Sequence, residues 1–156
     1  MVSAARSTRE RATQADHRRL LVPISGSDDH SKRALEIACI LAAKHSVITA
    51  VFVIEVSPLL PLDAQMADDE SAARLALLRA EAIGDRFGVR FKRRVIRARD
   101  PGPAIVELAK REATEMIVVA APRRRRAYGR HTFGHVVRHV LAKAPCRVLL
   151  VAPPVG

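Results

Sequence analysis

Aromatic side chains are scarce in this chain of 156 residues: they make up 3% of it, with one tyrosine and no tryptophan. Proteins that hold single-stranded nucleic acid stack its bases on exposed aromatic rings, so the composition nearly excludes that class. Cysteine is also rare, and we interpret Cys39 and Cys146 as small buried thiols rather than a disulfide. With 49% hydrophobic residues and so few rings, the predicted core is aliphatic.

Long hydrophobic runs are absent as well. No run approaches the roughly 18 residues that a membrane-spanning helix needs. The first residues of the chain are rich in arginine and lack the apolar stretch of a secretory signal. These features predict a cytoplasmic protein that does not insert into a membrane.

Acidic residues are missing from the last quarter of the chain. All 16 lie at or before Glu115, whereas eight basic residues follow Pro122. The rest of the positive excess lies in the first 19 residues, and the net charge is +11. Such a field attracts phosphate groups on nucleotides, nucleic acid or membrane lipids without selecting among them. A non-specific nucleic-acid binder is one interpretation, weakened by the lack of a recognition motif.

Apolar runs and amphipathic stretches alternate along most of the chain. Residues 1–18 show no periodicity and predict a flexible basic tail, and residues 19–156 are predicted to form a single domain. Along one long predicted helix, Leu75, Leu78 and Ala82 recur at helical spacing. Strands are predicted at 20–24, 46–55, 90–98, 115–121 and 146–152. Helices are predicted at 30–44, at 66–87, from about residue 103, and at 134–143.

Strands that alternate with helices five times predict an α/β fold, in which a doubly wound, parallel five-stranded sheet lies between two layers of helices. Right-handed crossovers favour the strand order 3-2-1-4-5, and the arginine-rich third strand is polar enough for a sheet edge. Ligands of such sheets bind at the carboxyl ends of the strands, where the winding reverses between strands one and four. This places the end of strand one opposite the end of strand four and the arginines that follow; the residues are Pro23, Ile24, Ser25 and Gly26 on one side and Val119, Ala120 and Ala121 on the other.

Three segments resemble the universal stress protein family, in the order and spacing found there. They are VPISGSDDHSKRALEIACILA at 22–42, RDPGPAIVELAKREATEMIVVAA at 99–121 and GHVVRHVLAKAPCRVLLVAP at 134–153. The similarity covers about residues 20–152 and implies that family's fold, which is of the adenine nucleotide alpha hydrolase-like type. Residues 121–151 are similar to family domains associated with amino-acid permeases and cation antiporters, in which arginines follow an Ala-Pro pair.

Nucleotide-binding members of this family carry the pattern G-x2-G-x9-G-[ST] after the fourth strand, where backbone amides approach the phosphates. When the pattern is aligned on Gly134, its first two glycines fall at Ala121 and Arg124 and its hydroxyl residue at His135. With Ala120 as the first position, the loop is one residue longer than the pattern. The resemblance therefore implies a degenerate phosphate loop.

The end of strand one also departs from the binding members. The binding members have an acidic residue there that faces the nucleotide. In this chain Ser25 occupies that position, although Pro23 is retained. By resemblance, Phe52 and Val53 lie beside an adenine, and packing in the core is the alternative. The candidate nucleotide-binding residues are Pro23, Ser25, Val53, Ala120, Ala121, Arg124, Arg130, Gly134, His135 and Val136.

Arginines occupy the loop in which the binding members have glycines. Arg123–Arg126 and Arg130 all lie at the predicted ligand edge of the sheet. In one interpretation their guanidinium groups replace backbone amides as phosphate ligands, because arginine binds phosphate through two hydrogen bonds. In the other they form a solvated loop that contacts no ligand.

Two further patterns carry no predicted chemistry. His131, His135 and His139 are spaced by four, which on one helix would place them on the same face. Because His131 precedes the predicted helix, it does not share that face, and no metal site is predicted. The turn from Ser25 to Ser27 contains hydroxyl groups, yet no general base is placed near it by the sequence. The chain is therefore predicted not to be an enzyme.

Two hypotheses about function follow. In the first, the chain is a regulatory or signalling module that binds a phosphate-containing nucleotide, ATP or another adenine nucleotide, at the degenerate site. In the second, it is a dimerising interaction domain that serves a membrane transporter and binds no nucleotide. Residues 146–152 form an apolar strand at a predicted sheet edge, and pairing of this strand across a two-fold axis predicts a homodimer.

Overall fold

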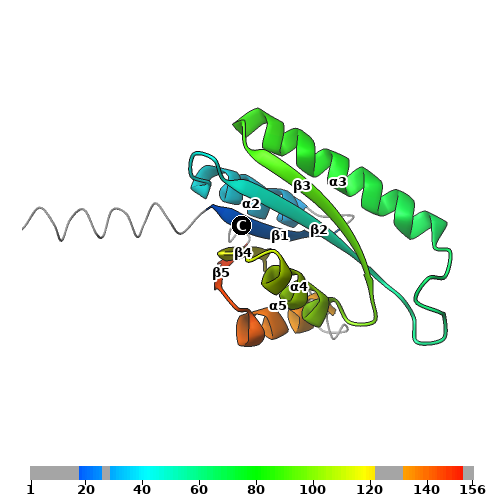
Figure 1. The fold of residues 1–156 in the computed structure, drawn as a ribbon. Coiled ribbons are helices and arrows are strands. Elements are labelled where there is room, and N and C mark those ends of the chain that lie inside the picture. The colour runs from blue at the N-terminus through cyan, green and yellow to red at the C-terminus, as the bar shows by residue number, and fades with distance from the viewer. Residues whose placement is uncertain (1–17, 26–28, 122–131, 153–156) are drawn as a thin grey trace, which may run out of the picture.

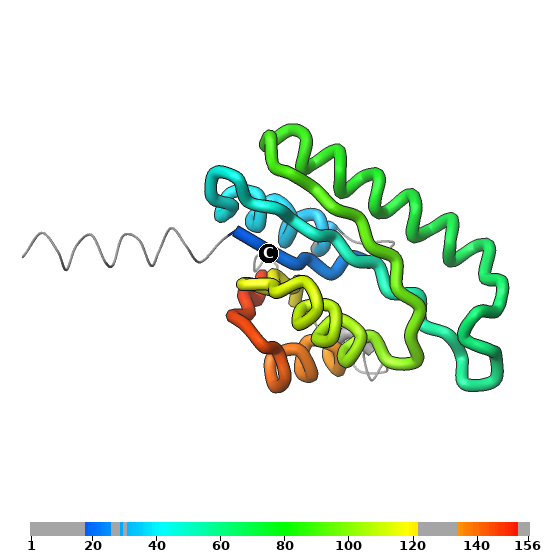
Figure 2. The backbone as a smooth tube through the Cα atoms, in the orientation of Figure 1, coloured from blue at the N-terminus to red at the C-terminus, as the bar shows by residue number. Residues whose placement is uncertain are grey.

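The computed structural model describes residues 18–25, 29–121 and 132–152. Within these ranges a sheet of five parallel strands has the order β3-β2-β1-β4-β5, which confirms the predicted topology. In Figure 2 the blue β1 runs between the cyan β2 and the yellow β4. The strands are β1 (Arg19–Ile24), β2 (Val47–Glu55), β3 (Arg90–Ala98), β4 (Met116–Ala120) and β5 (Arg147–Val151).

Two pairs of helices cover the two faces of the sheet, as the doubly wound fold requires (Figure 1). The first pair packs on a core cluster that includes Leu35 and Leu77, and the second pair on a cluster that includes Ile105 and Val140. Both clusters are almost entirely aliphatic, as the composition predicted. The helices are α2 (Asp29–Leu41) and α3 (Ala67–Phe87) on one face, and α4 (Pro101–Arg111) and α5 (Thr132–Lys143) on the other.

The start of α4 is held by its cap and by a close helix crossing. The Asp100 carboxylate accepts a hydrogen bond from the Gly102 amide at 3.2 Å, and Pro101 occupies the first turn. The helix thus begins two residues before the expected Pro103. A Cβ atom on Gly102 would lie 2.9 Å from the Cβ of His139 in α5, so glycine lets the two helices approach.

The buried face of α3 differs from the stripe that its leucines suggested. Leu75 and Leu78 are 50% and 53% exposed, and Ala82 is exposed too. The side that faces the sheet carries smaller residues, and a Cβ atom on Gly84 would lie 2.9 Å from the Phe91 ring. Close packing on β3 therefore selects the face with small side chains. That face consists of Ala73, Leu77, Ala80 and Gly84.

The strand at the polar edge is held by ion pairs with its neighbours. In β3, Arg93 pairs with Glu81 at 3.4 Å and Arg94 pairs with Glu112 at 2.8 Å. Most of the strand is exposed, which agrees with the predicted edge position, whereas β4 is buried throughout.

The first described residue is tied to the sheet by its backbone: the Arg18 carbonyl accepts from the Val47 amide at 2.7 Å. Residues 1–17 lie outside the described ranges, so the flexible tail stays a prediction.

Helix bounds differ slightly from those expected at two further places. The helix predicted for residues 134–143 begins at Thr132. The helix predicted for residues 30–44 ends at Leu41, and His45 adopts a positive φ of 69° in the turn before β2. The Ser46 amide donates to the Ala43 carbonyl at 3.0 Å, which closes the turn that leads the chain into β2. None of the helices in the described part of the chain is long and apolar enough to span a membrane.

Candidate functional site

A cavity of about 200 Å³ lies at the carboxyl ends of β1 and β2, on the face of the sheet that α4 and α5 cover. Because the strands are parallel and Ile24 pairs with Phe52, both strands end at this edge of the sheet. The winding of the sheet reverses at this point, which is where doubly wound folds bind ligands. The cavity is lined by Pro23, Ile24, Ser25, Val51, Phe52, Val53, Glu55, Pro101, Ile105, Val119, Val136 and Val137.

The wall of this cavity is apolar and carries a single charge. Val51, Val119 and Ile105 are buried, and they present aliphatic surface from β2, β4 and α4. Among the described lining residues, Glu55 at the end of β2 has the only charged side chain. Its carboxylate is exposed and makes no hydrogen bond or ion pair within the described ranges. The arrangement can bind a flat apolar group together with a hydrogen-bond donor at the rim.

Four of the ten residues predicted from the sequence line this cavity. Pro23 and Ser25 come from the end of β1, Val53 from β2 and Val136 from α5. They converge because the right-handed crossovers bring the end of β2 and the start of α5 to the same edge as the end of β1.

The other predicted residues lie elsewhere or outside the described ranges. Ala120 is buried in the core cluster on the α2 and α3 face, and the Ala121 amide donates to the Val151 carbonyl at 2.8 Å. That amide is therefore used within the sheet. Gly134 and His135 lie in the first turn of α5 and do not line the cavity. Outside the described residues lie Arg124, Arg130, the rest of Arg123–Arg126, Gly26, Ser27 and His131.

The sequence analysis missed several lining residues. Glu55 was not singled out, although a charged residue that ends an otherwise apolar strand is a usable signal once the strand register is known. Val119 was expected at this edge of the sheet, whereas Ile105 carries no local signal of this kind, because its pattern is that of an ordinary core residue. The same holds for Pro101 and Val137.

Two serines tie the end of β1 to α2. The Ser25 amide donates to the Ser31 hydroxyl oxygen at 3.1 Å, and the two hydroxyl oxygens lie 3.4 Å apart. Ser31 is only 5% exposed, so these contacts are shielded from solvent and hold the end of β1 against the first turn of α2.

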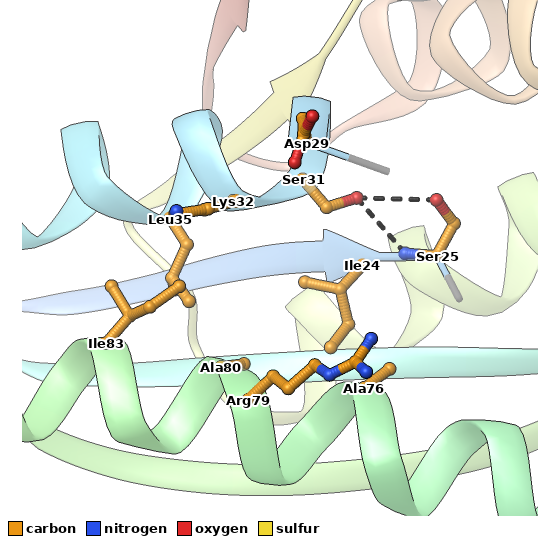
Figure 3. Close-up of a pocket in the computed structure, with 10 residues that line it drawn as sticks. All are labelled: Ile24, Ser25, Asp29, Ser31, Lys32, Leu35, Ala76, Arg79, Ala80 and Ile83. Carbon is orange, nitrogen blue, oxygen red and sulfur yellow. Dashed lines mark hydrogen bonds between the residues drawn. The ribbon is translucent and has the colours of Figure 1, made fainter. Parts of the chain in front are cut away.

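A second cavity, of about 220 Å³, lies on the opposite side of β1 between α2 and α3 (Figure 3). It shares Ile24 and Ser25 with the first cavity. Its charged lining residues include Lys32 from α2 and Arg79 from α3, so the two cavities differ in electrostatic character.

One of the two thiols is buried as predicted, Cys39, whereas Cys146 is only half-buried. Cys39 is 5% exposed, and burial raises the pKa of its thiol to about 11, with a further contribution from the Glu36 carboxylate. Burial also raises the pKa of the half-buried Cys146, which a hydrogen bond with the Ile117 backbone partly offsets. Both cysteines are free thiols, as expected. In the described ranges, no group of three or more histidine, cysteine, aspartate or glutamate residues is placed to hold a metal ion.

Comparison with known sequences identifies the family that this chain matches. The sequence profile of the universal stress protein family matches residues 17–152. A universal stress protein from Methanocaldococcus jannaschii is 25% identical over 147 residues, which make up 88% of this chain and 84% of that protein.

Solved structures show the same fold at low sequence identity. The universal stress protein from Archaeoglobus fulgidus in complex with dAMP has a TM-score of 0.68 at 20% identity, and the match covers 85% of this chain and 95% of that one. A family protein from Arabidopsis thaliana with AMP bound has a TM-score of 0.61 at 16% identity, and the match covers 87% and 92% of the two chains.

Proposed function

This chain belongs to the universal stress protein family, and from that premise we propose that it is a regulatory module that binds an adenine nucleotide. The proposed site is the cavity at the carboxyl ends of β1 and β2. The similar proteins from Archaeoglobus fulgidus and Arabidopsis thaliana hold dAMP and AMP, which supports this class of ligand.

One observation carries the proposal: an apolar cavity at the winding reversal has a single carboxylate at its rim. A purine ring packs between the aliphatic side chains of Val53 and Val136, where it is removed from water. The ionised Glu55 carboxylate accepts hydrogen bonds from the ribose hydroxyl groups, because it offers acceptor oxygens only. The nucleotide-binding members have an acidic residue at the position of Ser25. In this proposal the Glu55 carboxylate replaces that residue as the acid that contacts the nucleotide.

The phosphate groups point away from Glu55, since like charges repel, and towards the first turn of α5. The helix N-terminus carries partial positive charge, and a Cβ atom on Gly134 would meet no described atom within 4 Å. Arg124 and Arg130, which lie outside the described residues, supply side-chain contacts to the phosphates. Contacts of this kind at an open rim are screened by salt.

Calorimetric titration of AMP into the full chain tests this proposal. We expect binding that is roughly micromolar or weaker and that weakens steeply with added salt. Arg124→Ala combined with Arg130→Ala should weaken binding more than Arg6→Ala combined with Arg9→Ala, which removes the same charge from the N-terminal segment. Equal losses would mean that the arginine loop contributes only through the net charge of the protein. No binding at low salt would refute the proposal.

A second candidate function rests on the edge of the sheet. The strand order leaves β5 at an edge, and Leu150 on it is 43% exposed. An apolar edge strand pairs readily with a second copy, so the alternative is a dimerising interaction domain that serves a membrane transporter. Light scattering at tens of micromolar decides this point: a dimer mass that Leu150→Lys converts to a monomer mass supports it, and a monomer mass for the unmodified chain contradicts it.

A further inference from the structure

The cavity between α2 and α3 lies apart from the proposed nucleotide site, on the other side of β1 (Figure 3). We propose that this cavity binds a small monoanion with an apolar body, of the kind represented by a medium-chain carboxylate. The proposal does not depend on nucleotide binding, because the two cavities have only Ile24 and Ser25 in common.

The walls of the cavity are apolar and close to the core. Leu35 from α2 is 1% exposed, Ala80 from α3 is 4% exposed, and Ile24 at the end of β1 is 9% exposed. Ala76 lies one turn from Ala80 on the same side of α3, and the two short side chains leave the space between the helices unfilled (Figure 3). An apolar cavity of roughly 150 Å³ is large enough for benzene. The present volume of about 220 Å³ therefore admits a somewhat larger apolar group.

The rim of the cavity carries an uncompensated positive charge. Arg79 extends from α3 towards the end of β1, and within the described ranges it makes no hydrogen bond or ion pair (Figure 3). Its helical neighbours at three and four residues' distance are not acidic, so α3 itself offers no counterion; they are Leu75, Ala76, Ala82 and Ile83.

The balance of charges at the rim selects one negative charge. Lys32 adds a second cation and has no ion-pair partner in the described part of the chain, whereas Asp29 adds one carboxylate. Among the described residues that line this cavity, two cations and one carboxylate leave a single net positive charge, which matches a monoanion better than a polyphosphate. Among the described residues that line the first cavity, only Glu55 is charged, so this wall offers no cation to pair with a carboxylate ligand. An apolar carboxylate is therefore directed to the cavity between α2 and α3.

Octanoate is a suitable probe, and 1-octanol serves as its uncharged analogue. Methyl NMR of the full chain locates the site: octanoate should perturb Leu35 and Ile83, which line only this cavity, and leave Val53 and Val136 of the other cavity unchanged. The binding should saturate and be tighter than that of 1-octanol. Perturbation confined to Val53 and Val136, or no saturable perturbation, would overturn the proposal.

Two variants separate a site from general attraction to a basic protein. Arg79→Gln should weaken octanoate binding roughly two- to fivefold, the range expected of an exposed ion pair. Arg74→Gln removes an exposed charge from the same helix outside the cavity and should have no effect. Ala76→Leu, whose fold is checked by thermal unfolding, should fill the cavity and abolish binding. Equal effects of Arg79→Gln and Arg74→Gln, or undiminished binding by a folded Ala76→Leu variant, would refute the assignment.

Discussion

The Glu55→Gln variant tests the role that we assign to the rim carboxylate. A hydrogen bond to an ionised acceptor contributes about 1 kcal/mol more than one to a neutral acceptor. Glu55 is exposed, so solvent screening lowers the expected loss to about 0.5–1 kcal/mol. Adenosine binding should therefore weaken roughly two- to fivefold. The change keeps the size of the side chain, and the apolar wall of the cavity is unaltered.

Calorimetry with two ligands provides the assay. The unmodified chain should bind adenosine more tightly than 2′,3′-dideoxyadenosine, which lacks the ribose hydroxyl groups, and Glu55→Gln should reduce this preference. Glu107→Gln is the matched control, because Glu107 is exposed on α4 and does not line the cavity. If Glu55→Gln leaves the preference between the two nucleosides unchanged, the carboxylate does not contact the ribose.

Two further predictions concern stability. Gly102→Ala places a Cβ atom 2.9 Å from the Cβ of His139 and should lower the free energy of unfolding by about 1–3 kcal/mol. Gly134→Ala is the control, because no described atom lies within 4 Å of its Cβ, and it should be neutral or stabilising. Urea denaturation measures both variants. Since burial raises the pKa of Cys39 from 9.0 to about 11, its contribution to stability is fully present below pH 9 and decreases as the pH rises through 11. The difference in unfolding free energy between the chain and Cys39→Ala should shrink over that interval, and a constant difference would contradict it.

The strand order can be predicted from the sequence because it depends on the amino-acid composition of each strand. Continuous aliphatic runs predict strands covered on both faces, and β4 is buried throughout. The arginines of β3 predict a polar edge, and right-handed crossovers leave few ways to arrange the remaining strands. The same rules predict that ligands bind at the winding reversal, where Pro23 and Ser25 line a cavity, whereas Val53 was expected there only from the family resemblance.

The surfaces that line the site depend on contacts between segments far apart in the chain. Glu55 reaches the candidate nucleotide cavity only because parallel pairing brings the ends of β1 and β2 to one edge. Ala121 matches a glycine position of the family pattern, yet its amide is bonded to β5 and is not directed at a ligand. A sequence pattern records the type of a residue, whereas the availability of its amide depends on the neighbouring strand.

The identity and spacing of its residues already specify where this chain forms strands and helices, and how its sheet is wound. They do not specify which side of α3 is buried, because Leu75 and Leu78 repeat at the same helical spacing as Leu77 and Ala80. The distance between α3 and β3 decides it, since only small side chains fit where Gly84 meets Phe91. Periodicity is a local property of the sequence, whereas packing distance is a property of two elements together, and the second determines both the core and the cavities.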